Sequence, residues 1–137
     1  MIGVTRGELI INDVSDIVVV RKTVRQAAAS LNFSLSDITR IVTAASELAR
    51  NVYLYAGSGK VVWQTIDDAG MTGIQLTFED HGPGIRDLEK AMQEGWSTSG
   101  GLGLGLPGTR RLMDEMEIDT GGDNGTTIVI KKWRRRN

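Results

Sequence analysis

The stretch from Ser34 to Gly57 constrains the fold of this 137-residue chain more than any other part of it. Ser34 and Asp37 resemble the start of a capping box, and Gly57 fits the residue that ends a helix. Between them, apolar residues recur three and four positions apart, at Ile38, Ile41, Val42, Ala45, Leu48, Ala49 and Val52. This spacing is typical of an amphipathic α-helix, so the sequence predicts a long helix over residues 34–57 with one apolar face.

Further strand and helix patterns lie on both sides of this helix. Residues 3–11 are typical of a strand, and residues 13–33 repeat apolar side chains at helical spacing behind a cap at Ser15 or Asp16. The run IVVV at 17–20 could equally form a strand, but the length of the segment favours a helix. Residues 60–66 and 73–80 are predicted strands, and the residues between Asp67 and Thr72 favour a hairpin turn.

The second half of the chain adds two helical patterns and two strands. A short helix is expected near residues 86–93, and helical spacing resumes over 106–116, where Pro107 fits the first turn. Residues 117–120 and 126–133 are the last predicted strands. The order β-α-α-β-β-α-α-β-β predicts an α+β fold in a single domain over residues 1–137, a two-layer sandwich with a mixed, mostly antiparallel sheet and helices on one face.

The composition excludes several classes of active site. Apolar residues make up 40% of the chain and charged residues 24%, as in an ordinary soluble globular protein. The chain contains no cysteine, which rules out disulfides, thiolate chemistry and Cys-ligated zinc. Because His81 is the only histidine, a His-rich metal site and an ordinary Ser-His-Asp triad are also hard to build.

Charge is distributed unevenly along the chain. The net charge is −1, but KKWRRR at 131–136 holds five of the 16 basic residues, which leaves eleven basic and 17 acidic residues over 1–130. A basic tail with one aromatic residue, Trp133, could contact nucleic acid or an acidic partner, but a solvated terminus after the last strand is the favoured interpretation. The sequence shows neither a signal peptide nor an apolar run of about 18 residues, so we expect a cytoplasmic protein that does not act on membranes.

Residues 99–108, SGGLGLGLPG, contain five glycines, which suit either a loop built around a ligand or a hinge. A dinucleotide-binding fingerprint needs a strand directly before G-x-G-x-x-G, whereas EGWSTSG precedes it here. A Walker A loop needs a following Gly-Lys-Ser/Thr, which is absent from the sequence. What remains is a glycine-rich loop leading into a helix N-terminus, whose free N–H groups suit an anion such as phosphate.

Two further groups of residues bear on the nature of that anion. Asp80 ends a predicted strand next to Gly82 and Gly84, so a carboxylate able to accept from the amino group of adenine lies beside open backbone, although the same residues suit an ordinary turn. Glu47 and Asn51 are four residues apart and leave the long helix on one face. An amide oxygen suits Mg²⁺ and a carboxylate can orient a nucleophile, although a solvated polar pair has the same spacing.

Four segments in this order resemble the conserved boxes of the GHKL ATPase and kinase superfamily, whose members have the Bergerat ATP-binding fold. They are SELARN at 46–51, EDHGPG at 79–84, GGLGLGL at 100–106 and GTTIVI at 125–130. The longer stretches SELARNVYLYAGSGKV, EDHGPGI and STSGGLGLGLPGTRRLMDE, with the terminal IKKW, are similar to the switch kinases of the bacterial stressosome in particular. The resemblance covers the chain from about residue 37 to its end.

The resemblance implies a role for each matching residue. Asn51 would bind Mg²⁺, Glu47 would be the catalytic base or orienting group for the acceptor, and Asp80 would bind the adenine amino group. The other ATP-binding residues would be Gly82 and Gly84 at the adenine pocket, Gly101, Gly103 and Gly105 around the phosphates, and Thr126 beside Asp80. Residues from about 85 to 100 would form a lid that closes on ATP. His81 is assigned no chemistry.

The same resemblance implies a function. We expect an ATP- and Mg²⁺-dependent protein serine/threonine kinase that phosphorylates STAS-domain antagonist proteins, similar to RsbS and RsbR, in a partner-switching stress response. Once released from these substrates, the kinase would bind and activate a downstream effector such as a PP2C-type phosphatase. The alternative is an anti-sigma factor of the same superfamily, which would bind a sigma factor directly, and the third interpretation is a nucleic-acid-binding domain.

Overall fold

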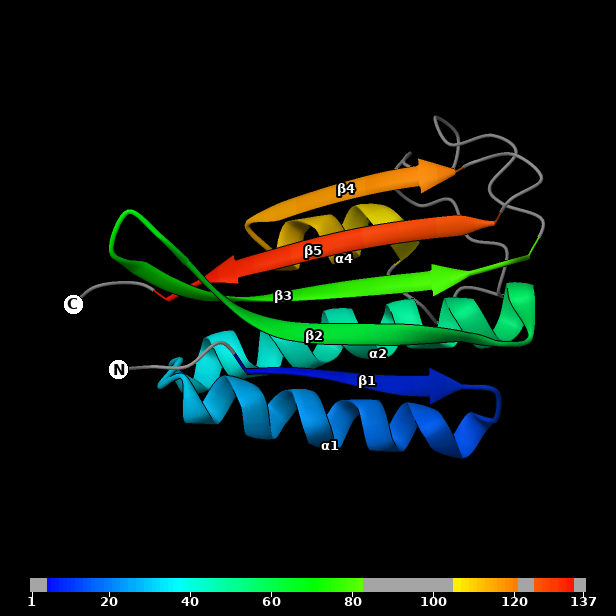
Figure 1. Cartoon of the computed structure of the whole chain (residues 1–137), viewed down its shortest axis with the longest axis horizontal. Helices are drawn as coiled ribbons and strands as arrows, with labels where there is room; N and C mark the ends of the chain where they lie inside the picture. The colour runs from blue at the N-terminus through cyan, green and yellow to red at the C-terminus, as the bar shows by residue number, and fades with distance from the viewer. Residues whose placement is uncertain (1–4, 83–104, 121–124, 135–137) are drawn as a thin grey trace.

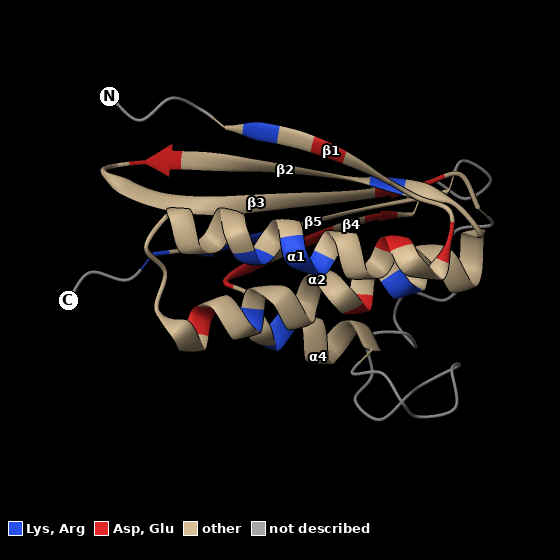
Figure 2. Cartoon of the chain, turned by 90° about the horizontal axis from the view of Figure 1, so that it is seen from below, with Lys and Arg blue, Asp and Glu red and all other residues tan. Residues whose placement is uncertain are grey.

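The computed structural model describes residues 5–82, 105–120 and 125–134. Its elements are β1 (Arg6–Ile11), α1 (Val14–Ser30), α2 (Leu35–Ala56), β2 (Gly59–Asp68), β3 (Met71–Asp80), α4 (Gly105–Leu112), β4 (Glu115–Thr120) and β5 (Thr126–Trp133). The strands form one sheet in the order β1-β2-β3-β5-β4, and each neighbouring pair is antiparallel. Helices α1, α2 and α4 cover one face of this sheet (Figures 1 and 2), so the predicted two-layer α+β sandwich is confirmed. The short helix expected at 86–93 lies outside the described residues.

A hydrophobic core fills the space between the sheet and the helices. Alternate residues of the strands point into it, and the apolar stripe of α2 faces them, as its spacing predicts. The largest fully buried side chains include Phe78, Ile11, Ile41, Leu48, Ile74, Leu76 and Ile130. Truncating one such side chain to alanine costs about 2–5 kcal/mol, so this packing holds α2 firmly against the sheet. Within the described residues, no helix combines the length and the apolar character needed to cross a bilayer.

The two ends of α2 have the predicted caps. Ser34 Oγ accepts a hydrogen bond from Asp37 N at 3.1 Å, and Gly57 N donates to Tyr53 O at 3.1 Å. Gly57 has φ of 81°, a left-handed conformation that glycine adopts without steric cost. The helix therefore ends directly before β2 begins at Gly59, which fixes its C-terminal turn against the end of the sheet.

The helical interpretation of residues 13–33 is confirmed, but its predicted cap is wrong. Asp13, rather than Ser15 or Asp16, is the N-cap. Its carboxylate accepts from the hydroxyl of Ser15 and from Ser15 N, and these bonds lower the pKa of Asp13. Asp16 completes a capping box by accepting from Asp13 N at 3.1 Å. The pair satisfies the free N–H groups of the first turn, so the helix starts earlier than predicted.

The predicted helix over residues 106–116 is too long, because α4 ends at Leu112. Asp114 N donates to Lys131 O at 2.9 Å, and β4 begins at the next residue. Exposed and partly buried residues then alternate along β4, with Met116 opposite Ile130 of β5. Pairing with β5 and this period of two override the helical spacing of the sequence.

The first three residues of the C-terminal basic stretch, Lys131, Lys132 and Trp133, lie in β5, which confirms the strand predicted over residues 126–133. Lys132 points into the protein, where its Nζ donates to Leu112 O at 2.9 Å. The same Nζ lies 3.8 Å from Asp37 Oδ1 and 3.7 Å from Asp114 Oδ1. Arg40 adds a second cation at 2.9 Å from Asp37 Oδ1. These four charged residues are called the Lys132 cluster below.

Candidate functional site

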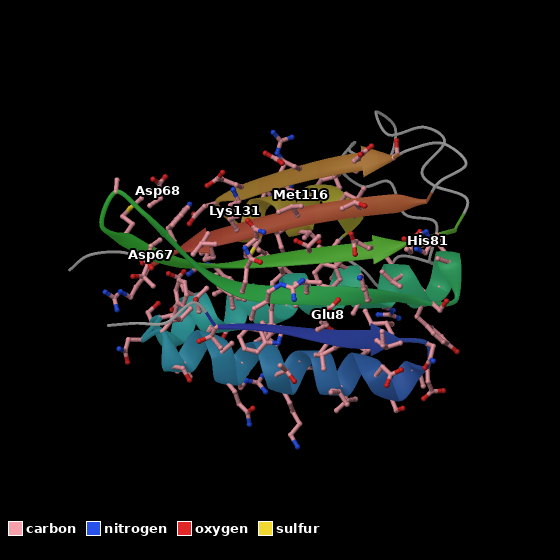
Figure 3. All side chains as sticks on the ribbon, in the orientation of Figure 1. Glu8, Asp67, Asp68, His81, Met116 and Lys131 are labelled. Atoms are coloured by element: carbon pink, nitrogen blue, oxygen red, sulfur yellow. The ribbon has the colours of Figure 1, made fainter. Side chains whose placement is uncertain are left out.

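Of the predicted site residues within the described ranges, Asp80, Gly82 and Thr126 lie at one end of the two-layer scaffold, whereas Asn51 and Glu47 lie further back along α2. At this end β3 and α2 finish, and β5 and α4 begin (Figure 1). Figure 3 marks it by His81, directly after β3, whereas Asp67 and Asp68 of the β2–β3 turn mark the opposite end. We refer to it as the Asp80 end. His81 is exposed there.

Asp80 lies in the sheet between two neighbouring strands at this end. It is in register with Gly59 of β2 on one side and with Thr126 of β5 on the other. Its Oδ1 accepts a hydrogen bond from Gly82 N at 3.0 Å. Thr126 is buried beside it. The fold therefore brings together Asp80, Gly82 and Thr126, three of the residues that the sequence assigns to nucleotide binding.

Glycines allow the backbone to pack closely around Asp80. A Cβ on Gly82 would lie 2.7 Å from the Cβ of Ala56 in α2, and one on Gly125 would lie 2.0 Å from Asp80 O. Gly125 also has φ of 92°, which strains any other residue. On the β2 side, a Cβ on Gly59 would lie 2.4 Å from Glu79 O. Larger residues at these positions would displace the strand end that carries the Asp80 carboxylate.

Three of these neighbours were not singled out by the sequence analysis. Gly125 could have been identified, because it opens the GTTIVI segment that resembles a superfamily box. Gly59 and Ala56 carry no comparable signal, since their closeness to Asp80 arises from strand pairing and from the packing of α2 against the sheet.

Glu47 and Asn51 lie one turn apart on α2, and both are half-buried. Within the described ranges, neither side chain has a hydrogen bond or an ion pair. Because no buried side-chain nitrogen or oxygen atom of the described residues lacks a partner, the polar atoms of Glu47 and Asn51 reach solvent, where they are free to contact a ligand. The residues directly before them in the sequence, Ser46 and Arg50, line a groove between α1 and α2. Successive residues of a helix differ in direction by about 100°, so Glu47 and Asn51 face the side of α2 next to this groove.

The same helix connects this pair with the surroundings of Asp80. Ala56, which packs under Gly82, is about 8 Å along the helix axis from Asn51 and about 14 Å from Glu47. Asp80, Asn51 and Glu47 thus follow one another along the direction of α2. This order suits an elongated ligand with one end at Asp80 and the other near Glu47.

The N-terminus of α4 completes the described part of the site. Its first residue, Gly105, has φ of 67°, and the buried hydroxyl of Thr109 donates to Gly105 O at 3.0 Å. Pro107 occupies the first turn, as predicted. The helix lies beside α2, on the side away from α1 (Figure 2). Gly84, Gly101, Gly103 and the expected lid over residues 85–100 lie outside the described residues.

The residues at the Asp80 end fit a magnesium nucleotide. The Asp80 carboxylate can accept from an exocyclic amino group, and the close approach of Gly82 to Ala56 leaves flat backbone beside it. The amide oxygen of Asn51 is a hard donor that suits Mg²⁺. The described part of the chain holds no group of three His, Cys, Asp or Glu side chains able to bind a metal ion. An ion at Asn51 would therefore draw further ligands from phosphate oxygens and water.

Known proteins match nearly the whole chain. A profile of the histidine kinase-like ATPase domain matches residues 10–132. The serine/threonine-protein kinase RsbT of Bacillus subtilis (strain 168) is 50% identical over 120 residues, which are 88% of this chain and 90% of RsbT. The anti-sigma F factor of Thermoanaerobacter sp. (strain X514) is 33% identical over 118 residues, 82% of each protein.

Solved structures share the fold at lower sequence identity. The RsbU and RsbW domains of Rv1364c from Mycobacterium tuberculosis superpose with a TM-score of 0.66 and 20% identity, over 98% of this chain and 34% of that one. The mycobacterial sensor histidine kinase MprB superposes with a TM-score of 0.55 and 16% identity, over 97% of this chain and 100% of that one. At these identities the similarity shows the architecture alone.

Proposed function

Because this chain belongs to the family of histidine kinase-like ATPase domains, we propose that it is an ATP- and Mg²⁺-dependent protein serine/threonine kinase of a partner-switching module. The 50% identity to a serine/threonine-protein kinase, over 90% of that protein, supports this activity. One structural observation carries the assignment of the site. Glu47 and Asn51 are half-buried, lie one helical turn apart and have no partner within the described residues.

Binding of the nucleotide is assigned to both layers of the fold. The Asp80 carboxylate would accept from the adenine amino group and repel the carbonyl oxygen that guanine carries in its place. Asn51 would hold Mg²⁺ through its amide oxygen, and the N–H groups at the start of α4 would donate to phosphate oxygens. Bound Mg-ATP supplies the phosphoryl group, and Mg²⁺ neutralises part of its charge.

Glu47 would be the catalytic base. Its carboxylate takes the proton of an acceptor hydroxyl while that oxygen bonds to the γ-phosphorus and the bond to the bridging oxygen of ADP breaks. Most of the rate enhancement would come from holding the two reactants in line. A serine or threonine of another protein is the proposed acceptor, because His81 is the only histidine of the chain and its position has no assigned chemistry in the family.

The proposed substrates are STAS-domain antagonist proteins similar to RsbS and RsbR. Phosphorylation would release the kinase from them, and the free kinase would then bind a downstream effector such as a PP2C-type phosphatase in the cytoplasm. The similarity to RsbT supports this placement. Nucleic acid is a poor alternative, because Lys132 is buried within the fold and Lys131 lies 4.0 Å from Glu115.

An anti-sigma factor is the second candidate, since anti-sigma F factors match 82–85% of the chain at 33–34% identity. An anti-sigma factor would bind ATP and a sigma factor, and STAS-domain proteins would act as its regulators. The lower identity ranks it below the kinase. Binding of a purified sigma factor would distinguish it.

The decisive experiment mixes the purified chain with radiolabelled Mg-ATP and a STAS-domain protein encoded beside it, and locates the label by mass spectrometry. Label on a serine or threonine of the STAS protein, lost in Glu47→Ala and in the isosteric Glu47→Gln, supports the kinase. Nucleotide binding without transfer favours the anti-sigma factor. No nucleotide binding at all contradicts both.

A further inference from the structure

A groove of about 350 Å³ opens at the surface between α1 and α2. Its apolar lining comprises Val14, Ile17 and Val18 of α1 and Tyr53 and Leu54 of α2. Val14, Val18 and Leu54 remain 60%, 57% and 49% exposed, so three of the five apolar lining residues reach the surface. An apolar surface that crosses two helices and is left open is typical of a protein interaction site.

Two guanidinium groups, Arg21 of α1 and Arg50 of α2, also line this groove. Neither lies within ion-pair distance of a carboxylate among the residues that the structure describes. Some cations outside the groove are paired: Lys60 lies 3.2 Å from Glu8, and Lys132 belongs to its own cluster. Arg21 and Arg50 are the charged residues that line the groove, so its charge is positive although the chain as a whole carries a net charge of −1. Its charge therefore complements an acidic partner.

The shape of the groove selects a helical partner. On α1, Val14, Val18 and Arg21 are spaced at i, i+4 and i+7, so they lie on one face of the helix. On α2, Ser46, Arg50 and Leu54 are each four residues apart and form the facing stripe. Seven residues of α1 span about 10 Å, which is the length of two helical turns. Two such stripes bound a trough that accepts the apolar side of an amphipathic helix, with carboxylates flanking that side.

The position of the groove connects it with the candidate catalytic pair. Ser46 and Arg50 line the groove, and the residues that directly follow them, Glu47 and Asn51, face the adjoining side of α2. A protein held in the groove is thus held beside the groups that transfer the phosphoryl group. Figure 2 shows α1 and α2 from the side, with both basic and acidic residues on the two helices.

We propose that the groove between α1 and α2 docks an acidic, amphipathic helix of the protein substrate, beside the site of transfer. This inference rests on the proposed kinase function. It assigns substrate recognition to Val14, Val18, Leu54, Arg21 and Arg50, none of which belongs to the nucleotide site.

The test measures binding of the purified STAS-domain protein to the full chain by titration calorimetry, in parallel with binding of Mg-ATP. Val18→Glu is expected to weaken STAS binding by about tenfold or more, because it places a charge in the apolar trough. Val19→Glu is the matched control: Val19 is also exposed, at 46%, but it does not line the groove. Affinity for Mg-ATP and the melting temperature should be alike in the two variants.

A charge reversal tests the complementarity separately. Arg21→Glu is expected to weaken STAS binding and to flatten its dependence on salt, whereas Lys22→Glu, next to it but outside the groove, should leave both near the wild-type values. An Asp or Glu of the docked helix, changed to Arg, should restore binding to Arg21→Glu.

Three results would overturn the proposal. If the wild type phosphorylates the STAS protein and Val18→Glu binds it as well as Val19→Glu does, the groove has no part in docking and the kinase function stands. If Val18→Glu abolishes self-association seen by light scattering and leaves STAS binding intact, the groove holds a second copy of the chain. If the wild type neither binds Mg-ATP nor phosphorylates the STAS protein, the proposed function fails and substrate docking fails with it.

Discussion

Two regions of the scaffold use polar residues in opposite ways. At the end where α2 begins, the Lys132 cluster joins Lys132, Arg40, Asp37 and Asp114, and each charge has an opposite charge beside it. Between this cluster and the Asp80 end, the half-buried side chains of Glu47 and Asn51 on α2 have no partner within the described residues. The first arrangement stabilises the fold by itself, whereas the second leaves polar groups free for the ligand proposed above. The two groups of residues thus differ in pairing more than in residue type.

The Lys132 cluster also shows why a buried charge needs several partners. The side chain of Lys132 is 8% exposed, and those of Asp37 and Asp114 are 12% and 16% exposed. Desolvation of three such charges is offset only by good geometry, and the bond from Lys132 to Leu112 O supplies part of it. This bond also caps the last turn of α4, so the cluster ties α4 to α2 and β5.

Replacing Asn51 is expected to have the largest effect on nucleotide binding and almost none on stability, in contrast to changes in the Lys132 cluster. Asn51→Ala is expected to abolish detectable binding of Mg-ATP, because the amide oxygen that holds Mg²⁺ is lost. The melting temperature without nucleotide should change by no more than about 2 °C, since no described partner is lost. Thermal shift with and without Mg-ATP measures both. Full nucleotide binding in this variant would move the metal site elsewhere.

The carboxylate one turn away should affect chemistry rather than binding. Glu47→Ala is expected to lower the rate of phosphoryl transfer by about 10²–10⁴-fold, the usual contribution of a general base. Its affinity for Mg-ATP should stay within about twofold of the wild type. Single-turnover transfer and calorimetry test the two halves. A variant with normal transfer would remove Glu47 from the mechanism.

At the opposite end, substitution should affect stability and leave the site intact. Lys132→Met leaves Asp37 and Asp114 without their shared cation and is expected to cost about 3 kcal/mol, which lowers the melting temperature by roughly 10 °C. Lys131→Met is the matched control, because this more exposed neighbour lies 4.0 Å from Glu115 and should cost less than about 1 kcal/mol. At low temperature both variants should bind Mg-ATP normally. Equal stability of the two would show that the cluster contributes nothing.

Asp80 is an intermediate case between the paired Lys132 cluster and the unpaired Glu47 and Asn51, because its carboxylate accepts one hydrogen bond, from Gly82 N. Asp80→Asn keeps an oxygen able to accept from Gly82 N, so stability should hold. Affinity for ATP is expected to fall by about tenfold or more, as a charged acceptor is lost. The preference for ATP over GTP should narrow, because the repulsion of guanine is removed. Competition binding with both nucleotides measures this, and an unchanged preference would place the adenine contact elsewhere.

The smallest effect is expected at the cap of α2. Ser34→Ala removes the bond to Asp37 N and should cost about 1 kcal/mol. Because Asp37 also belongs to the Lys132 cluster, Ser34→Ala combined with Lys132→Met tests whether the two couple. Costs that add within about 0.5 kcal/mol would contradict coupling through Asp37. Denaturant unfolding of the single and double variants provides the values.

Local patterns made much of the fold predictable. The stripe from Ile38 to Val52, the Ser34 cap and the left-handed Gly57 depend on neighbours within a few residues, and the structure has all three. The end of α4 was not predictable in this way. It depends on Lys131 and Lys132 of β5, about 20 residues further along the chain, which bond to Asp114 N and Leu112 O. Long-range pairing of this kind leaves no periodic signal in the sequence.

In the candidate site, too, features that depend on nearby residues were predictable from the sequence, and features that depend on long-range packing were not. The i, i+4 spacing by itself predicts that Glu47 and Asn51 share one face of a helix, because residues four apart are neighbours on a helix surface. Gly59 and Ala56 were missed because only the sheet register brings Gly59 to Asp80 and only the packing of α2 brings Ala56 to Gly82. The cap of α1 shows the limit at short range, since Asp13, Ser15 and Asp16 are all good capping residues and their bonds decide among them.

The continuity of α2 restricts how the length of this chain can vary. This 22-residue helix, about 33 Å long, carries Asp37 near one end and Glu47 and Asn51 further along, with no break between them. One residue inserted after Asp37 would turn everything beyond it by about 100°, so Ser46 of the groove would take the direction of Glu47, and Glu47 would take that of the buried Leu48. Insertions at the β2–β3 turn, around Asp68, would only lengthen a hairpin. Descendants of this sequence can therefore grow at the hairpin, whereas the helix has to keep its count of residues.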